Sequence, residues 1–392
     1  MVEGWEKVSI LKCCDILDNM RRPLNQEQRS KIQGNIPYYG ANNIQDYIDD
    51  FIFDESLILI AEDGGYFEEF ATRPIAQRIE GKSWVNNHTH ILRAKKDYYQ
   101  DYIFYSLVHK NILYYIKGGT RSKLNKSDLE EIELLFPKEK KEQQKIADIL
   151  SSVDSAIEST SKIISKQKRI KTALMQDLLT HGIDENGKIR SEQIHQYKDS
   201  PLGRIPAEWD NISVSQSCDI LDNMRRPLNQ EQRSKIQGNI PYYGANNIQD
   251  YINNFLFDEP LILIAEDGGY FEEFATRPIA QRVEGKSWVN NHTHILRAKK
   301  DYIQDYIFYS LVHKNILYYI KGGTRSKLNK SDLEEIEIAF PISKIEQQKI
   351  AHILSKQDEA IEQEDRKLAK LQRIKTALMQ DLLSGKVRVK YE

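Results

Sequence analysis

Two stretches of the chain repeat apolar residues at alternating spacings of four and three, with no proline or glycine, over residues 142–179 and 350–382. The first series is Ile146, Leu150, Val153, Ile157, Ile164, Leu174 and Leu178. This heptad spacing predicts two long helices of the coiled-coil type, each with one apolar seam. Because one seam cannot be buried alone, we expect the helices to pack antiparallel after the chain turns back through the polar segment 180–203.

The segment that precedes each helix has a different pattern, which is typical of mixed α and β structure. Buried strands are expected at 51–65, which ends in Asp-Gly-Gly, and at 84–92, which alternates and is rich in β-forming residues. Apolar residues at helical spacing predict a helix over 97–116. A glycine turn at 118–119 is followed by a predicted capping box from Ser127 to Glu130.

The chain contains one unit twice. The stretch beginning CDILDNMRRPLNQ starts at Cys14 and again at Cys218, an offset of 204 residues that holds without a gap through mild changes such as Asp49 to Asn253. We therefore expect an α+β chain with mixed globular domains at 1–136 and 205–340, long helices within 137–180 and 341–392, and a linker at 181–204. Equal domains on antiparallel helices would be pseudo-twofold symmetric, and such a pair reads an inverted repeat on duplex DNA.

Composition narrows the possible classes of protein. The 392 residues are 40% hydrophobic and 29% charged, with a formal net charge of −2. No apolar run is long enough to span a membrane, and the first residues do not resemble a secretion signal, so we expect a cytoplasmic protein. Cys13, Cys14 and Cys218 are too few for a disulfide framework. The near-neutral charge excludes a globally basic nucleic-acid wrapper, so any such surface must be local or shared with a partner.

Motifs for catalysis are weak. The chain has no phosphate-binding loop of the G-x-x-x-x-G-K-[ST] type and no G-x-G-x-x-G after a strand. Glu62, Asp63, Glu68 and Glu69 are interpreted as solvated turn residues and not as a nuclease cluster. The two histidines of the HTH triplet at 88–90 lack a third ligand nearby, so they are interpreted as hydrogen-bonded histidines and not as zinc ligands. The sequence therefore predicts no catalytic residue and no metal site.

Basic and amide-rich loops are the better candidates for chemistry. Arginine pairs with guanine and asparagine with adenine, whereas lysine mostly contacts phosphates. For any single residue the alternative is an ordinary solvated loop residue. The candidate DNA-binding residues are Arg21, Arg22, Arg29, Lys31, Asn42, Asn43, Asn86, Asn87, Arg121 and Lys123, and in the second copy Arg225, Arg226, Arg233, Lys235, Asn246, Asn247, Asn290, Asn291, Arg325 and Lys327.

Four further motifs, taken in order, resemble those of a known family, and they recur in both copies except that the first copy keeps only Gly4-Trp5 of the first motif. They are KDSPLGRIPAEW at 198–209, GGTRSKLNKSDLEEIELLFP at 118–137, EQQKIADIL at 142–150 with EQQKIAHIL at 346–354, and QKRIKTALMQDLL at 167–179 with QRIKTALMQDLL at 372–383. Together they resemble the specificity subunit of a type I restriction-modification system over nearly the whole chain. The resemblance implies two target-recognition domains separated by two long antiparallel helices.

The resemblance also implies partners and cofactors. Two methyltransferase subunits would bind S-adenosylmethionine, and two motor-nuclease subunits would use ATP and Mg²⁺, while this chain would bind double-stranded DNA without cofactor, active site or membrane. Family members usually have two different recognition domains, whereas the two here are nearly identical, which predicts an interrupted palindromic site. The alternative is a free-standing regulator that binds twofold-symmetric DNA.

Overall fold

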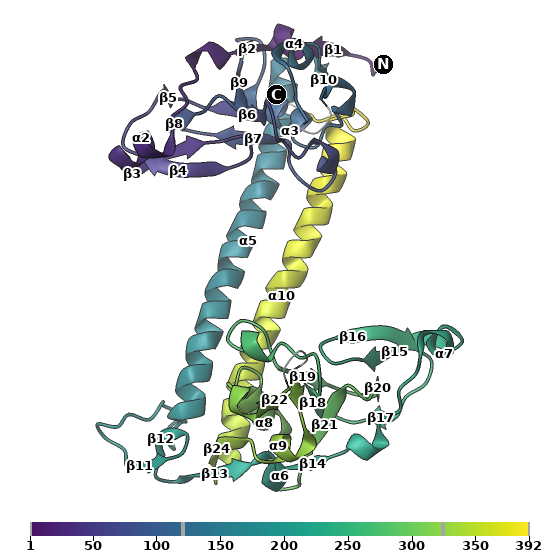
Figure 1. Ribbon diagram of the computed structural model, residues 1–392. Helices are drawn as coiled ribbons and strands as arrows, with labels where there is room; N and C mark the ends of the chain where they lie inside the picture. The colour runs from purple at the N-terminus through teal and green to yellow at the C-terminus, as the bar shows by residue number, and fades with distance from the viewer. Residues whose placement is uncertain (1, 119–121, 323–325, 391–392) are drawn as a thin grey trace. The chain divides into compact units, whose positions relative to one another are not determined.

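The computed structural model describes residues 2–118, 122–322 and 326–390. The chain forms two compact units, Met1–Lys162 with Arg366–Glu392 (unit 1) and Ile163–Asp365 (unit 2). Each unit contains one globular head, about half of the long helix α5 (Lys140–Thr180) and about half of the long helix α10 (Lys344–Leu382) (Figure 1). Among the described residues, no helix combines the length and the apolar content that a membrane span needs.

The predicted long helices and their antiparallel packing are confirmed within unit 1. Glu142 at the start of α5 pairs with Arg388, and Asp154, three turns later, pairs with Lys375. Because the partner's number falls as the α5 number rises, the two segments run in opposite directions. The seam residues Ile146 and Leu150 are fully buried, as the heptad pattern requires.

Head 1 consists of two four-stranded sheets, a two-stranded ribbon and short helices. The first sheet has the order β2 (Cys14–Ile16), β9 (Thr89–Ala94), β6 (Leu57–Ala61) and β7 (Ala76–Ile79), all antiparallel. The second has the order β4 (Ile44–Ile48), β3 (Gln33–Tyr39), β8 (Lys82–Val85) and β5 (Phe53–Asp54), with β3 and β8 parallel. The ribbon pairs β1 (Trp5–Ser9) with β10 (Glu133–Pro137), and the helices are α1 (Ile10–Cys13), α2 (Gln26–Lys31), α3 (Gln100–Leu107) and α4 (Lys126–Glu130).

Head 2 repeats this arrangement. Its sheets are β14 (Cys218–Ile220), β21 (Thr293–Ala298), β18 (Leu261–Ala265) and β19 (Ala280–Val283), and β16 (Ile248–Ile252), β15 (Gln237–Tyr243), β20 (Lys286–Val289) and β17 (Phe257–Asp258). The ribbon is β13 (Trp209–Ser213) with β24 (Glu337–Pro341), and the helices are α6 (Val214–Ser217), α7 (Gln230–Ser234), α8 (Gln304–Leu311) and α9 (Lys330–Glu334). Two hairpins complete unit 2, β11 (Tyr197–Ser200) with β12 (Gly203–Pro206), and β22 (Ile320–Lys321) with β23 (Lys327–Leu328).

The apolar run LILIA forms the central strand β6, and all five of its residues are buried. Successive side chains of a strand point to opposite faces. Ile58 and Ile60 accordingly pack in the cluster that contains α3 and the start of α5, whereas Leu57 and Leu59 pack in a second cluster with Phe53. A strand covered on both faces reads as a continuous apolar run, which explains why this segment shows no alternation.

Three local predictions were wrong in detail. The helix expected over 97–116 ends as α3 at Leu107, and a 3₁₀ turn at Leu113–Tyr115 follows. The strand expected over 84–92 is two strands, β8 and β9, because Asn86 bends the chain by accepting a hydrogen bond from the backbone N–H of His88. The N-cap of α4 is Asn125, two residues before the predicted Ser127, and capping boxes occur instead at α2, α6 and α7.

Each head is tied to both long helices by a tyrosine, an aspartate and a lysine. In unit 2, the Tyr309 hydroxyl of α8 donates to Asp358 of α10 at 2.7 Å, and Lys171 of α5 pairs with the same carboxylate at 2.5 Å. In unit 1, Tyr105 and Lys375 bind Asp154 at 2.8 and 2.6 Å. One carboxylate therefore links three elements in each unit.

Candidate nucleic-acid interface

A polar hollow of about 450 Å³ lies on head 2. Most of its wall consists of amide and other hydrogen-bonding side chains, and the residues that line it are Pro227, Leu228, Asn229, Gln232, Arg233, Tyr242, Gln249, Asn290, Asn291 and His292. These residues come from four separate segments, so only folding brings them together. An open hollow with several amide groups can match the donors and acceptors on base edges.

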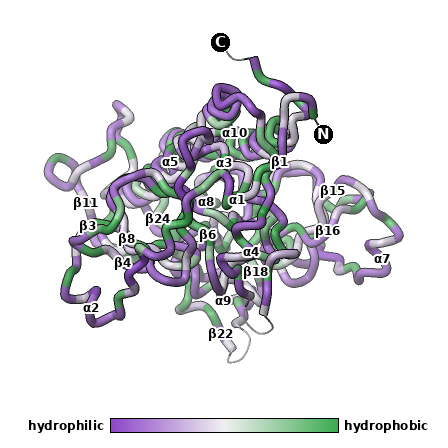
Figure 2. Tube along the Cα trace, turned by 90° about the horizontal axis from the view of Figure 1, so that it is seen from above, coloured by the Kyte–Doolittle hydropathy of each residue, from purple (hydrophilic) through white to green (hydrophobic). Residues whose placement is uncertain are grey.

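The helix α7 forms one wall of the polar hollow, and its trace is hydrophilic (Figure 2). Asn229 caps this helix through its side chain, which accepts from the Gln232 N–H at 2.8 Å, while the Gln232 side chain accepts from the Asn229 N–H at 2.9 Å. Arg233 lies over the Tyr242 ring at 5.1 Å and donates to Asp250 at 3.0 Å. These contacts hold the wall in one conformation.

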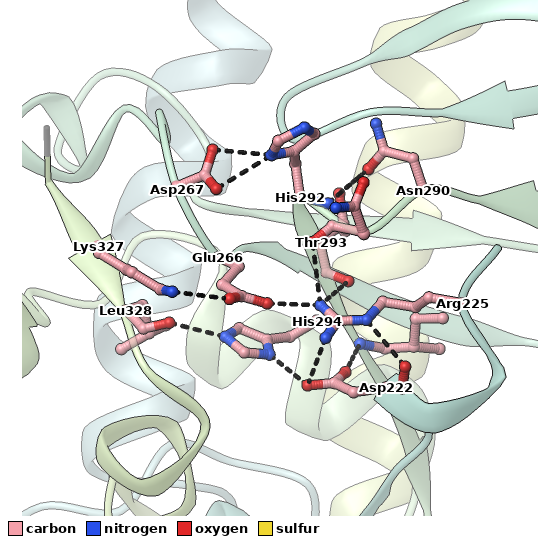
Figure 3. Close-up of polar contacts among 12 residues, drawn as sticks. Asp222, Arg225, Glu266, Asp267, Asn290, His292, Thr293, His294, Lys327 and Leu328 are labelled. Carbon is pink, nitrogen blue, oxygen red and sulfur yellow. Dashed lines mark hydrogen bonds and ion pairs between the residues drawn. The ribbon is translucent and has the colours of Figure 1, made fainter. Parts of the chain in front are cut away.

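The turn between β20 and β21 also lines the polar hollow. Asn290 is only 3% exposed, and its side-chain oxygen accepts from the backbone N–H of His292 at 2.9 Å (Figure 3). Its amide nitrogen donates to Gln249 of β16 at 3.3 Å. The His292 ring donates from Nδ1 to Asp267 at 3.0 Å. The buried Asn290 therefore serves to position its neighbours.

A partly buried charged cluster lies next to this turn (Figure 3). Arg225 pairs with Glu266 at 2.6 Å and with Asp222 at 3.7 Å, and it also donates to the backbone oxygens of Asn291 and Thr293. Asp222 also accepts from His294 at 2.6 Å, and Lys327 pairs with Glu266 at 3.2 Å. Head 1 has the same cluster, with Arg21 2.5 Å from Glu62 and His90 2.6 Å from Asp18. This network braces the loop that carries Asn291.

Asp222, Glu266 and His294 have ligand atoms close enough together to be considered for a metal ion. Both ring nitrogens of His294 already have polar neighbours, since Nε2 lies 2.8 Å from the Leu328 carbonyl oxygen and Nδ1 lies 2.6 Å from Asp222. Both nitrogens are therefore engaged within the protein, and the Arg225 guanidinium occupies the space between the carboxylates. The donor set therefore fits a hydrogen-bonded cluster better than a metal centre.

The carboxylates of this cluster have lowered pKa values. Burial by itself raises the pKa of Asp222, but hydrogen bonds from His294 and the Ile295 N–H, together with the Arg225 charge, outweigh it and lower the pKa below its usual value. The same balance lowers the pKa of Asp18 in head 1. Burial also raises the pKa of Glu266, but hydrogen bonds from Arg225 and Lys327 outweigh this effect. The pKa of Glu266 is therefore lowered.

A lowered pKa in the folded state predicts a defined loss of stability in acid. Stability from such a carboxylate is present above its unfolded pKa, about 3.9 for aspartate, and is lost as the pH falls through the folded value. We expect the unfolding temperature to hold between about pH 7 and 5 and to fall steeply below about pH 4. Calorimetry of the protein and its Asp18→Asn, Asp222→Asn variant checks this, because the variant should lose part of that dependence. An equal slope in both proteins would contradict it.

The predicted DNA-binding residues fall into three groups. Side chains engaged within the heads are Arg21, Arg29, Asn42 and Asn86, with their counterparts Arg225, Arg233, Asn246 and Asn290. Exposed side chains are Arg22, Lys31, Asn43, Asn87 and Lys123, with Arg226, Lys235, Asn247, Asn291 and Lys327, of which the lysines form surface ion pairs. Arg121 and Arg325 lie outside the described residues.

The structure brings Asn290, Asn291 and Arg233 to the polar hollow and places Lys327 on the hairpin beside it, where Asp267 and Lys327 form a β-bridge. Sequence reasoning missed Gln249, Gln232 and Asn229 and assigned no role in binding to His292. The amide-rich run NNIQ at 246–249 was the available signal, because its Asn residues were selected and its Gln was not.

Comparison with known proteins agrees with this architecture. The model of the type I restriction modification DNA specificity domain matches residues 2–168 and 206–373. A type I restriction enzyme MjaVIII specificity subunit from Methanocaldococcus jannaschii is 24% identical over 99% of this chain and 94% of its own length. A Haemophilus influenzae protein assigned as a type I restriction enzyme specificity subunit is 28% identical over 87% of this chain and 84% of its own.

A solved structure has the same fold. The S subunit of a type I restriction-modification system from M. genitalium superposes with a TM-score of 0.72 at 18% identity, over 96% of both chains. The matched domain confers DNA specificity and is not a catalytic one. Since two copies of that domain cover most of the sequence, this chain belongs to the family of type I restriction-modification specificity subunits.

Proposed function

We propose that this chain reads a bipartite DNA site whose two halves are equal and inverted, an interrupted palindrome. The observation that carries the proposal is that the two heads have the same candidate interface. The contacts of Arg21, Asn86 and His88 recur at Arg225, Asn290 and His292 with nearly the same distances. Heads with the same binding groups favour the same bases, and antiparallel helices favour an inverted arrangement.

Residues 1–136, which form head 1, and residues 205–340, which form head 2, act as the two target-recognition domains. The exposed Arg226 and Asn291, with Arg22 and Asn87 in head 1, are the candidates for contact with base edges and phosphates. Arg225 and Asn290 act through these neighbours and are positioning residues. Lys235 and Lys327 are exposed and suited to phosphate contact, which contributes affinity but no sequence choice.

The chain works as the DNA-choosing part of a larger assembly. Two methyltransferase subunits that bind S-adenosylmethionine and two restriction subunits that use ATP and Mg²⁺ would supply the chemistry, and this chain would need no cofactor. The exposed polar face of α5, with Lys162, Lys166 and Lys168, is proposed to receive helices of the methyltransferase. The near-neutral charge of the chain supports the proposal that the partner subunits also contact the DNA.

Mapping methylated adenines in a host that carries the chain with its methyltransferase tests the proposal. The expected result is one methylated motif with two equal, inverted halves and a fixed spacer. Unlike halves would contradict the palindrome, and unmethylated DNA would contradict the assembly. Tight sequence-specific binding by the isolated chain in a gel shift at two salt concentrations would instead favour a free-standing regulator.

A further inference from the structure

The hydrogen-bond polarity of the polar hollow is fixed by the backbone. The His292 N–H can only donate, so the Asn290 side-chain atom that it meets at 2.9 Å must be the oxygen. The other end of that amide is therefore the NH₂ group, which donates to Gln249 at 3.3 Å. Gln249 must accept with its oxygen, and its own NH₂ group consequently faces away from Asn290.

The outer NH₂ group of Gln249 is available for a ligand. Gln249 is exposed and lines the polar hollow, and its Nε2 forms no hydrogen bond with any residue of the described ranges. Gly244 packs directly against the side chain, and a Cβ at that position would collide with the Gln249 amide. The side chain is thus held between Gly244 and Asn290 with one polarity.

Head 1 contains the same chain of hydrogen bonds from a backbone N–H through an asparagine to a glutamine. The His88 N–H donates to Asn86 at 2.8 Å, and Asn86 donates to the oxygen of Gln45 at 3.2 Å. Gly40 leaves room for Gln45 in the same way that Gly244 does for Gln249.

We propose that Gln249 and Gln45 are specificity-determining residues that present their outward NH₂ donor to DNA and therefore select a base with an acceptor oxygen at that point of its edge, O6 of guanine or O4 of thymine. Guanine offers the acceptors N7 and O6 and thymine offers O4, whereas cytosine offers only an amino donor and adenine offers an amino donor beside its N7 acceptor. An amino group facing the Gln249 NH₂ group would leave two donors in contact without an acceptor. The inference rests on the proposed function, because it requires the heads to read DNA.

The substitution Gln249→Glu tests this polarity. The new carboxylate can still accept from Asn290, but its outer oxygen is an acceptor in place of a donor. In binding-site selection with the full chain and its methyltransferase subunits, the wild type should select guanine or thymine at one matched position of both half-sites. Gln249→Glu should shift that position by about tenfold or more toward cytosine or adenine in one half-site only, because head 1 is unchanged.

Two further variants separate polarity from other effects. Asn229→Asp adds the same charge to the polar hollow and preserves the helix cap, so it should weaken binding without inverting that base preference. Gly244→Ala should displace Gln249 and relax the preference at the same position. An unchanged preference in Gln249→Glu, or an inversion in Asn229→Asp, would overturn the inference. A wild-type assembly that selects no sequence would overturn the proposed function itself.

Discussion

Replacing Arg190 with alanine is expected to destabilise unit 2 by about 3 kcal/mol or more, because it leaves a buried carboxylate without its charge partner. Arg190 and Glu346 have side chains only 8% exposed, and the guanidinium forms two hydrogen bonds with that carboxylate, one of them at 3.1 Å. After the substitution, Glu346 retains the Ile183 N–H at 2.9 Å. Chemical denaturation of the purified protein, followed by the fluorescence of the nearby Trp209, measures the loss.

The stability losses of two matched variants provide a comparison for that of Arg190→Ala. Lys198→Ala removes an exposed pair with Asp210 and should cost less than about 1 kcal/mol. Arg388→Ala removes the equivalent partner of Glu142 in unit 1, where the carboxylate is 1% exposed but the arginine is 44% exposed, so its cost should lie between the other two. A loss for Arg190→Ala no larger than that for Lys198→Ala would show that the buried pair contributes little.

Reversing the charge of Lys171 is expected to be the second most damaging change, since it places a glutamate beside Asp358. Asp358 lies 2.5 Å from Lys171 and accepts from Tyr309, and both charged side chains are mostly buried, at 22% and 30% exposed. The double variant Lys171→Glu, Asp358→Lys should recover part of the loss, with a coupling energy of about 1–2 kcal/mol in a double-mutant cycle.

The same cycle at Lys375 and Asp154 in unit 1 provides an internal comparison, because the two pairs have nearly the same geometry. Lys162→Glu serves as the control, since Lys162 is 74% exposed and its ion pair among the described residues is with Glu158, one turn away in the same helix. Strictly additive losses in both cycles would mean that these pairs do not contribute to the pairing of the helices.

The sequence predicted the long helices well, and it named some of the residues that line the polar hollow but not others. The heptad seam from Ile146 to Leu178 is local information, since apolar spacing alone fixes which face of a helix must be covered. Arg21 and Arg29 show why the site was harder. Both are arginines in polar loops, yet their guanidiniums bind Glu62 and Asp46, which are distant in sequence.

By itself, the sequence determined the repeat, the two mixed heads, the helices and the family, because each depends on periodicity or on motifs within one segment. Only the tertiary structure decided which polar side chains form hydrogen bonds and ion pairs inside the heads and which remain for a ligand. It also decided the polarity of Gln249, which depends on a backbone N–H more than 40 residues away. Hydrogen bonds between distant segments have no sequence periodicity, so their partners are defined only when the chain is folded.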